Sequence, residues 1–278
     1  MSKTLRSLLI SFSGPVLIIL IWILCAHAID NKLVLPQLNL VLQHFLHPLT
    51  NLIGLGNLLK SVFISLLRVF LGYSVAVLLA IPIGVLMGYN KTVYGLLNSV
   101  ISLFRPIPPI SWVPLVLAWF GVTSIATIVG LTQGPSYVFF NNFKISMTFI
   151  IFLGAFFPIV TSSIHGVKNV QQQLIESAYV LGGSKGQIFS KILLPAAAPT
   201  IFNGMRTGLG VAWTCLASAE MLPGSLSGIG YLIMHGYELA RVDVVMTGMI
   251  SIGIVGALLD SLFRLIENKK FSWQIRLK

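Results

Sequence analysis

Very few side chains inside the long apolar segments of this sequence could take part in chemistry. The candidates are three arginines, Arg68, Arg105 and Arg206, and two acids, Glu220 and Asp260. A positive charge deep in an apolar segment needs an anion or water beside it. Arg105 and Arg206 therefore predict either an electropositive route for a small anion or a scaffold role, in which each caps freed carbonyls or pairs with Glu220 or Asp260. Arg68 is either an intramembrane charge or snorkels to an interface. No clustered acid, base or metal constellation accompanies them, so the sequence does not indicate an enzyme.

Three other patterns bear on ligand chemistry. His44 and His47 stand three residues apart, but no carboxylate or cysteine accompanies them, so surface histidines are a better interpretation than a metal site. Cys25 and Cys215 both lie in apolar runs, which disfavours a disulfide framework. The sequence contains no Gly-x-x-x-x-Gly-Lys-Ser/Thr phosphate loop, so any ATP hydrolysis must come from a partner.

The composition is that of a membrane protein. Hydrophobic residues make up 56% of the chain and charged residues 9%, outside the range of soluble domains. The net charge of +11 comes from single basic residues between apolar segments, which fits a positive-inside bias and not a nucleic-acid-binding patch. We therefore expect an all-α, polytopic membrane protein embedded in a lipid bilayer.

About six apolar segments are long enough to cross a ~30 Å hydrocarbon core. They are residues 8–29, 58–88, 93–121 with a break at 105–109, 145–164, 196–222 and 242–266. The sequence Ala26-His27-Ala28 resembles a signal-peptide cleavage site, but the first apolar run is too long, so an uncleaved first helix is favoured. Gly84 with Gly88, and Gly204 with Gly208, predict close helix contacts.

The third span is interrupted by prolines. Pro106, Pro108 and Pro109 follow Arg105 directly, and they end regular helix in the middle of an apolar segment. Backbone groups freed at membrane depth are tolerated only where protein or a watery cavity meets them. The break therefore predicts a pathway, with Arg105 and Arg206 as an electropositive constriction.

A polar island at residues 166–195 separates two of the long apolar stretches. Leu174, Ala178 and Leu181 mark a short amphipathic helix, and Gly182-Gly183 can end it in the left-handed conformation. Two short helices cannot form a core alone, so a second protein is expected to cover one side.

A second helix is expected directly after this glycine pair. Ser184 and Gln187 form a capping-box pattern at its start, and Pro195 is expected to stop it.

The island resembles the EAA signature of ABC importer membrane subunits. The matched positions are Glu176, Ala178, Gly182, Ile192, Leu194 and Pro195, with Ser177 in place of the middle alanine. In that family this loop sits in a groove of the ATPase subunit. The resemblance implies that the coupling residues are Glu176, Ser177, Ala178, Gly182, Gly183, Ile192, Leu194 and Pro195.

Further segments resemble the nitrate, sulfonate, taurine and bicarbonate branch of these permeases. They are residues 104–115, 119–121, 154–158, 204–213 and 219–220. The resemblance covers about residues 58–266 and implies the type I ABC importer permease fold. The residues expected along the pathway are Arg68, Arg105, Pro106, Pro108, Pro109, Trp112, Arg206, Trp213 and Glu220.

These features divide the chain into three parts. Residues 1–57 are an N-terminal spanning helix and outer loop, residues 58–266 the permease core, and residues 267–278 a cytoplasmic tail. Residues 122–144 depart from the branch by roughly 20 extra residues, which predict an extended outer loop with a short re-entrant piece at 124–131. An additional spanning helix there would invert the later topology.

The resemblance implies a subunit that translocates a small anion delivered by an extracytoplasmic binding protein. It implies a homodimer with two ATPase subunits that bind ATP and Mg, in a prokaryotic plasma membrane with both termini cytoplasmic. No cofactor in this chain and no nucleic acid are expected. A thiamine precursor or another small heterocycle is an alternative substrate. A secondary transporter is disfavoured, because no repeat is present and only Glu220 and Asp260 could serve as membrane acids.

Overall fold

The computed structural model describes residues 3–271, with side chains from residue 13 onward. Within these residues the secondary structure is helical, apart from two isolated bridges between loop residues. The helices are α1 (Lys3–Ile29), α2 (Leu38–Leu46), α3 (Leu58–Tyr89), α4 (Lys91–Phe104), η1 (Pro109–Trp112), α5 (Val113–Phe120), α6 (Ile125–Ile128), α7 (Pro135–Phe140), α8 (Ile145–Lys168), α9 (Gln172–Val180), α10 (Lys185–Ile188), η2 (Phe189–Leu193), α11 (Leu194–Glu220), α12 (Ile229–Glu238) and α13 (Val242–Lys270).

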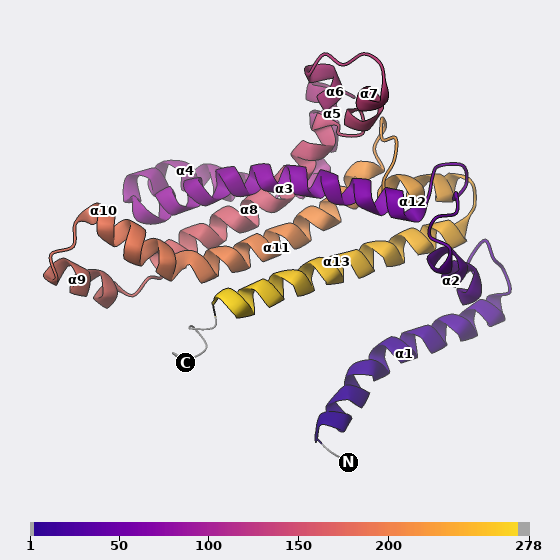
Figure 1. The fold of residues 1–278 in the computed structure, drawn as a ribbon, viewed down its shortest axis with the longest axis horizontal. Helices are drawn as coiled ribbons and strands as arrows, with labels where there is room; N and C mark the ends of the chain where they lie inside the picture. The colour runs from indigo at the N-terminus through magenta and orange to yellow at the C-terminus, as the bar shows by residue number, and fades with distance from the viewer. Residues whose placement is uncertain (1–2, 272–278) are drawn as a thin grey trace.

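Helix α8 lies at the centre of the bundle, between α3 and α11 (Figure 1). Glycines make both contacts close. A Cβ on Gly84 of α3 would lie 2.5 Å from the Cβ of Ser163, and one on Gly204 of α11 would overlap with Ser162. Gly88 and Gly208 approach α8 in the same way, so the close contacts predicted from the glycine spacing are confirmed.

Three helices, α3, α8 and α13, are long and apolar enough to cross a membrane. α4 passes the same test together with residues 109–120, although the two halves are bent by 88°. α1 and α11 occupy the remaining two predicted spans. α11 has 27 residues, and it carries the polar groups of Asn203, Arg206 and Glu220.

The second half of the third span does not continue in line with α4. The prolines after Arg105 break the helix, and η1 and α5 then leave the bundle sideways (Figure 1). A missing N–H and a fixed φ at each proline explain why α4 ends here. The direction of the turn is set by contacts of η1 and α5 with α8.

The additional segment after α5 is a closed loop that carries the short helices α6 and α7. Its ends are paired, because Ile125 N donates to Phe143 O at 3.0 Å and Ile145 N donates to Thr123 O at 3.0 Å. The helices have 4 and 6 residues, far too few to cross a membrane. The two ends of the loop therefore lie side by side next to the start of α8.

The N-terminal helix α1 extends away from the bundle (Figure 1). Its contacts are with α2, and Trp22 Nε1 donates to Pro36 O at 3.0 Å. α2 is linked to α13 by a hydrogen bond of 2.9 Å between His44 Nε2 and Asp243 Oδ2. Among the described residues no group of three His, Cys, Asp or Glu side chains could hold a metal ion.

Candidate functional site

The loop between α8 and α11 forms a sharp corner of two short helices. α9 ends where Gly182 takes a φ of 80° and its N–H donates to Tyr179 O at 2.9 Å. Gly183 N donates to Ala178 O at 2.9 Å, which completes the helix cap. Both bonds of the predicted capping box between Ser184 and Gln187 are present, so this part of the prediction is confirmed.

The second helix of the corner does not stop at Pro195, which corrects the prediction made from the sequence. α10 runs through a π-helical turn, η2, directly into α11, and Pro195 lies in the first turn of α11. A proline lacks the N–H that an α-helix interior would need. The wider π turn just before it changes the hydrogen-bonding pattern at this point, so the helix continues.

The tip of the corner is apolar and open to solvent. Val180 is 87% exposed and Leu181 is 86% exposed, although both are large hydrophobic residues. Ala178 and Ile188 are buried beneath them, and Ile175 packs against the cluster of Val85, Val167 and Leu193 at the end of the bundle. The corner is thus anchored on one side and has an uncovered apolar surface on the other.

The expected coupling residues lie on α9, at the glycine turn and where the corner joins α11. Glu176, Ser177, Gly182 and Pro195 are exposed, Gly183, Ile192 and Leu194 are half-buried, and Ala178 is buried. A Cβ on Gly182 would meet no atom within 4 Å, so only its backbone conformation requires glycine in this chain.

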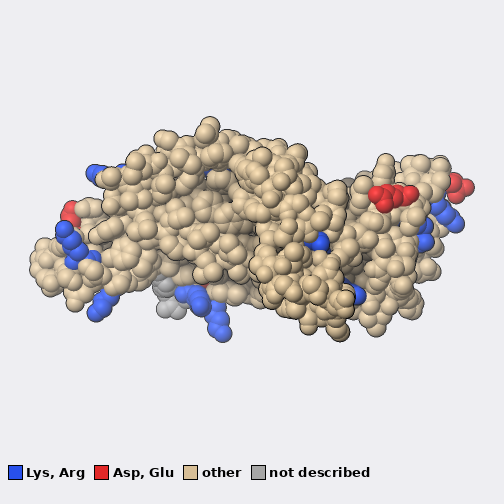
Figure 2. Space-filling view, turned by 90° about the horizontal axis from the view of Figure 1, so that it is seen from above, with Lys and Arg blue, Asp and Glu red and all other residues tan. Residues whose placement is uncertain are grey.

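Basic side chains predominate at the end of the bundle that carries α9 and α10 (Figure 2). Lys91, Lys168, Lys185 and Lys191 belong to this end, where Glu176 is the acid of α9. At the other end basic and acidic side chains are mixed (Figure 2).

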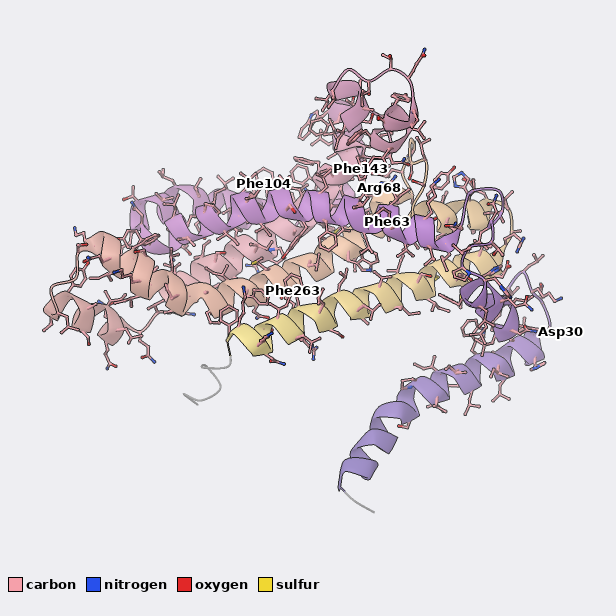
Figure 3. The ribbon with its side chains drawn as sticks, in the orientation of Figure 1. Asp30, Phe63, Arg68, Phe104, Phe143 and Phe263 are labelled. Atoms are coloured by element: carbon pink, nitrogen blue, oxygen red, sulfur yellow. The ribbon has the colours of Figure 1, made fainter. Side chains whose placement is uncertain are left out.

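Arg68 and Glu220 form a fully buried ion pair near the opposite end of the bundle (Figure 3). Arg68 Nη1 lies 2.7 Å from Glu220 Oε1, and both side chains are at most 1% exposed. Glu220 also accepts from Ser65 Oγ at 2.8 and 2.9 Å and from Gly230 N at 2.9 Å. Every oxygen of the carboxylate therefore has a donor.

The same network reaches the inserted loop. Arg68 Nε donates to Asn142 O at 2.8 Å, and Arg68 Nη1 donates to Ser227 O at 2.6 Å. Asn142 Oδ1 accepts from Ser227 Oγ at 2.6 Å. Next to it, Lys144 donates to Asn141, and burial together with the charge of Arg68 lowers the pKa of Lys144.

That Arg68, Glu220 and Trp213 line a pathway stays a prediction, and in this structure all three side chains are buried. The first two are enclosed in the network just described. Trp213 is 4% exposed, and its Nε1 donates to Ile252 O at 2.9 Å on α13. These three side chains connect helices of the same chain.

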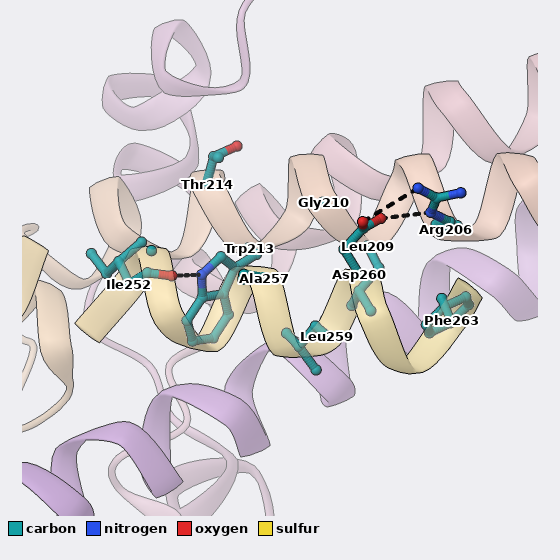
Figure 4. Close-up of a pocket in the computed structure, with 12 residues that line it drawn as sticks. Arg206, Leu209, Gly210, Trp213, Thr214, Ile252, Ala257, Leu259, Asp260 and Phe263 are labelled. Atoms are coloured by element: carbon teal, nitrogen blue, oxygen red, sulfur yellow. Dashed lines mark hydrogen bonds and ion pairs between the residues drawn. The ribbon is translucent and has the colours of Figure 1, made fainter. Parts of the chain in front are cut away.

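Arg206 lies on the side of α11 that faces α13 (Figure 4). Its Nε donates to Asp260 Oδ1 at 2.6 Å, and Glu267 is 3.4 Å away. Asp260 also accepts from Arg264 at 2.9 Å. Arg206 is thus neutralised by acids of α13, which is the ion-pair alternative given above.

Arg105 is exposed and lies on a different surface from Arg206. It lines a groove of about 370 Å³ between the proline break, α8 and α11, together with Pro109. Pro106 and Pro108 are exposed beside it, and Trp112 lies half-buried against Phe104. The two arginines do not form a common constriction in this chain, because they line separate pockets on α11.

Several residues that matter here were not singled out from the sequence. The groove of Arg105 also contains the hydroxyl side chains of Thr161, Ser162 and Thr207. Thr207 could have been recognised from helical spacing, because exposed small and polar residues recur every three or four positions along α11. That stripe consists of Thr200, Asn203, Thr207, Gly210 and Thr214.

Comparison with known proteins places this arrangement in a family. Residues 80–271 match the model of the binding-protein-dependent transport system inner membrane component. The chain belongs to this family. It is therefore a transport subunit and not an enzyme, and ABC importer permeases of this kind work with ATPase and binding-protein partners.

The names of similar proteins indicate the branch of the family. A protein of Methanocaldococcus jannaschii named as an ABC transporter permease is 44% identical over 98% of this chain and 95% of its own length. The taurine transport permease of Escherichia coli is 35% identical over 75% of this chain and 68% of its own. Sulfonate, nitrate and bicarbonate permeases are 33–35% identical. The permease thus belongs to the nitrate, sulfonate, taurine and bicarbonate branch.

The fold agrees with this assignment. The structure of the MetNI methionine ABC transporter in an inward-facing conformation contains a chain similar to this one, with a TM-score of 0.60. The match covers 76% of this chain and 95% of the other, at 21% sequence identity. At that identity the similarity shows the fold alone.

Proposed function

We propose that this permease carries a small anion across the membrane, driven by an ATPase that docks on the corner between α9 and α10. The observation that carries the proposal is the uncovered apolar tip of Val180 and Leu181 at the basic end of the bundle. Leu174 and Tyr179 of α9 are also about half exposed, and an exposed apolar patch is typical of a protein interaction site. ATP and Mg would bind to the ATPase partner.

The coupling residues act through this corner. Glu176 and Ser177 are exposed on α9 beside the tip, and Gly182 lets the turn stay narrow enough to enter a groove. Ile192, Leu194 and Pro195 lie where the corner joins α11, so they transmit its position to the membrane helix. The positive-inside bias puts this end, and both termini, in the cytoplasm.

A second copy of the permease would complete the transporter. The polar stripe on α11 supports this, because lipid is a poor cover for exposed threonine and asparagine side chains in a membrane helix. A homodimer encloses this face, together with the groove of Arg105. Two ATPase subunits and one extracytoplasmic binding protein then match the two copies.

The anionic substrate is proposed from the relatives and from the charges in the helices. Taurine, sulfonate, nitrate and bicarbonate are the cargoes in the relatives' names. The acids Glu220 and Asp260 are engaged by arginines, so among the described residues of the spans they leave no free negative charge to repel an anion.

The test is co-purification of the co-expressed ATPase, together with uptake in proteoliposomes. Leu181→Asp and Gly182→Asp should leave the amount of folded permease unchanged and remove both ATPase binding and uptake. Gln172→Glu, an exposed change at the start of α9, is the matched control. Normal ATPase binding by both tip variants would refute the docking site. Failure of the wild type to take up any of the three anions, nitrate, bicarbonate and a sulfonate, would refute the anionic substrate class.

A further inference from the structure

Arg105 differs from the other arginines in its lack of an acidic partner. Arg68, Arg206, Arg241 and Arg264 each form an ion pair with a carboxylate. Among the arginines whose side chains the structure describes, Arg105 alone has no ion pair or hydrogen bond within the chain. An arginine in an apolar segment needs compensation from an anion or from water.

The groove beside Arg105 offers hydrogen-bond donors that are also unused. Thr161 and Ser162 of α8 line it, and within the described part of the chain neither hydroxyl has a hydrogen-bond partner. Thr207 of α11 lines it from the other side. Its hydroxyl donates to Asn203 O at 3.0 Å and would turn away from this carbonyl to donate to an anion in the groove. No acidic side chain lines this groove.

The groove lies well inside the membrane region. Arg105 follows the 14 residues of α4, which correspond to ~21 Å of helix from the basic end. Thr207 stands 13 residues after the start of α11, or ~20 Å along it. Both distances end within the middle of a ~30 Å hydrocarbon core that begins a few residues into each helix.

Water can reach this depth along α11. The exposed residues Thr200, Asn203, Thr207, Gly210 and Thr214 form one continuous face that passes the groove. The groove volume of about 370 Å³ corresponds to roughly a dozen water molecules in the liquid. A small ion could therefore enter with part of its hydration shell.

We propose that this groove is a binding site for a small oxyanion in transit, with Arg105 as its charge and Thr161, Ser162 and Thr207 as neutral ligands. A guanidinium presents planar, forked donors that match two oxygens of a nitrate, bicarbonate or sulfonate group. The hydroxyls bind the remaining oxygens and discriminate between planar and tetrahedral groups by their positions. This inference rests on the proposed function and assigns its substrate contacts within the membrane.

The first experiment measures uptake of labelled nitrate, bicarbonate and taurine with the ATPase and the binding protein present. Arg105→Gln should lower uptake by about 10- to 100-fold, as expected for a lost charged hydrogen bond, while ATPase activity stimulated by the binding protein persists. Arg105→Lys should retain part of the uptake. Thr161→Val with Thr207→Val should change the ratio between nitrate and taurine uptake. Arg264→Gln, an exposed arginine on α13, is the control.

A second experiment does not depend on transport. In a variant with Cys25 and Cys215 replaced, Thr207→Cys is treated with an anionic and a cationic methanethiosulfonate reagent of similar size. The site predicts faster reaction with the anionic reagent, protection by nitrate, and reversal of the preference when Arg105→Gln is added.

The outcomes separate this inference from the proposed function. Normal uptake by Arg105→Gln, or no charge preference at position 207, overturns the site while the proposed transport stands. Failure of both Arg105→Gln and Arg105→Lys to fold, with no anionic preference at position 207, makes Arg105 structural and also overturns the site. If the wild type transports none of the three labelled substrates, of which taurine is a zwitterion with a sulfonate group, the proposed function itself fails.

Discussion

The buried pair of Arg68 and Glu220 can be tested for whether it stabilises the fold or takes part in a transport pathway. In Glu220→Gln one carboxylate oxygen becomes an NH₂ group of the same size. Oε1 accepts from Arg68 and Ser65, and Oε2 accepts from Gly230 N and Ser65. Whichever oxygen is replaced, the new N–H₂ group therefore faces the N–H of Arg68 or of Gly230.

The loss of stability expected for Glu220→Gln depends on the hydrogen bonds that Arg68 retains. Removing one partner of a buried ion pair costs about 3–5 kcal/mol, because the other charge is left uncompensated. Arg68 retains the carbonyl oxygens of Asn142 and Ser227 at 2.8 and 2.6 Å. We therefore expect a loss near the lower end, about 3 kcal/mol, which corresponds to a fall of roughly 10 °C in the unfolding temperature.

The assay is thermal unfolding of the purified permease in detergent. The fraction of protein that remains monodisperse is measured as the temperature rises. Glu238→Gln, an acid that is 51% exposed, is the control and should unfold with the wild type. The double variant Arg68→Gln with Glu220→Gln should lose less stability than the sum of the single variants, since no charge is left alone. A Glu220→Gln permease that unfolds at the wild-type temperature and yet fails to transport would refute the scaffold role.

Three further predictions address packing, topology and coupling. Gly204→Val should lower the unfolding temperature, because its side chain overlaps with Ser162, whereas Gly210→Ala on the open face should not, as measured in the same thermal assay. With Cys25 and Cys215 replaced, a membrane-impermeant thiol reagent added to intact cells should label Gln133→Cys and not Lys185→Cys, and the reverse would overturn the orientation. Deleting Ser190 should rotate the corner by ~100° relative to α11, so uptake should be lost while the permease still folds. Ser190→Ala is the control. Normal uptake by the deletion variant would argue against a fixed orientation of the corner relative to α11.

Local sequence signals predicted the corner and the close helix contacts. The Ser184–Gln187 capping box and the turn at Gly182 depend on residues within four positions of each other, so their geometry can be read directly. Gly84 and Gly204 were recognisable in the same way, since four-residue spacing of small side chains is typical of tightly packed membrane helices.

The roles of the arginines could not be predicted, because their partners are distant in the chain. Glu220 lies 152 residues after Arg68, and Asp260 lies 54 residues after Arg206. Only the packing of α3 and α13 against α11 decides that these two arginines are paired and that Arg105 is not. The prolines after Arg105 predicted a break, but the 88° turn depends on contacts of η1 and α5 with α8.

The one wrong local prediction, a helix stop at Pro195, explains how the corner and the groove are linked. α10, η2 and α11 form one uninterrupted helix from Lys185 to Glu220, which begins a few residues after the tip of Val180 and Leu181 and also carries Thr207. If the ATPase docks as proposed, we expect a shift of the tip to reach the groove of Arg105 along this helix. The π turn at residues 189–193 is the point where such a helix bends most easily. The corner and the membrane helix are thus joined by continuous helix and not by a loop.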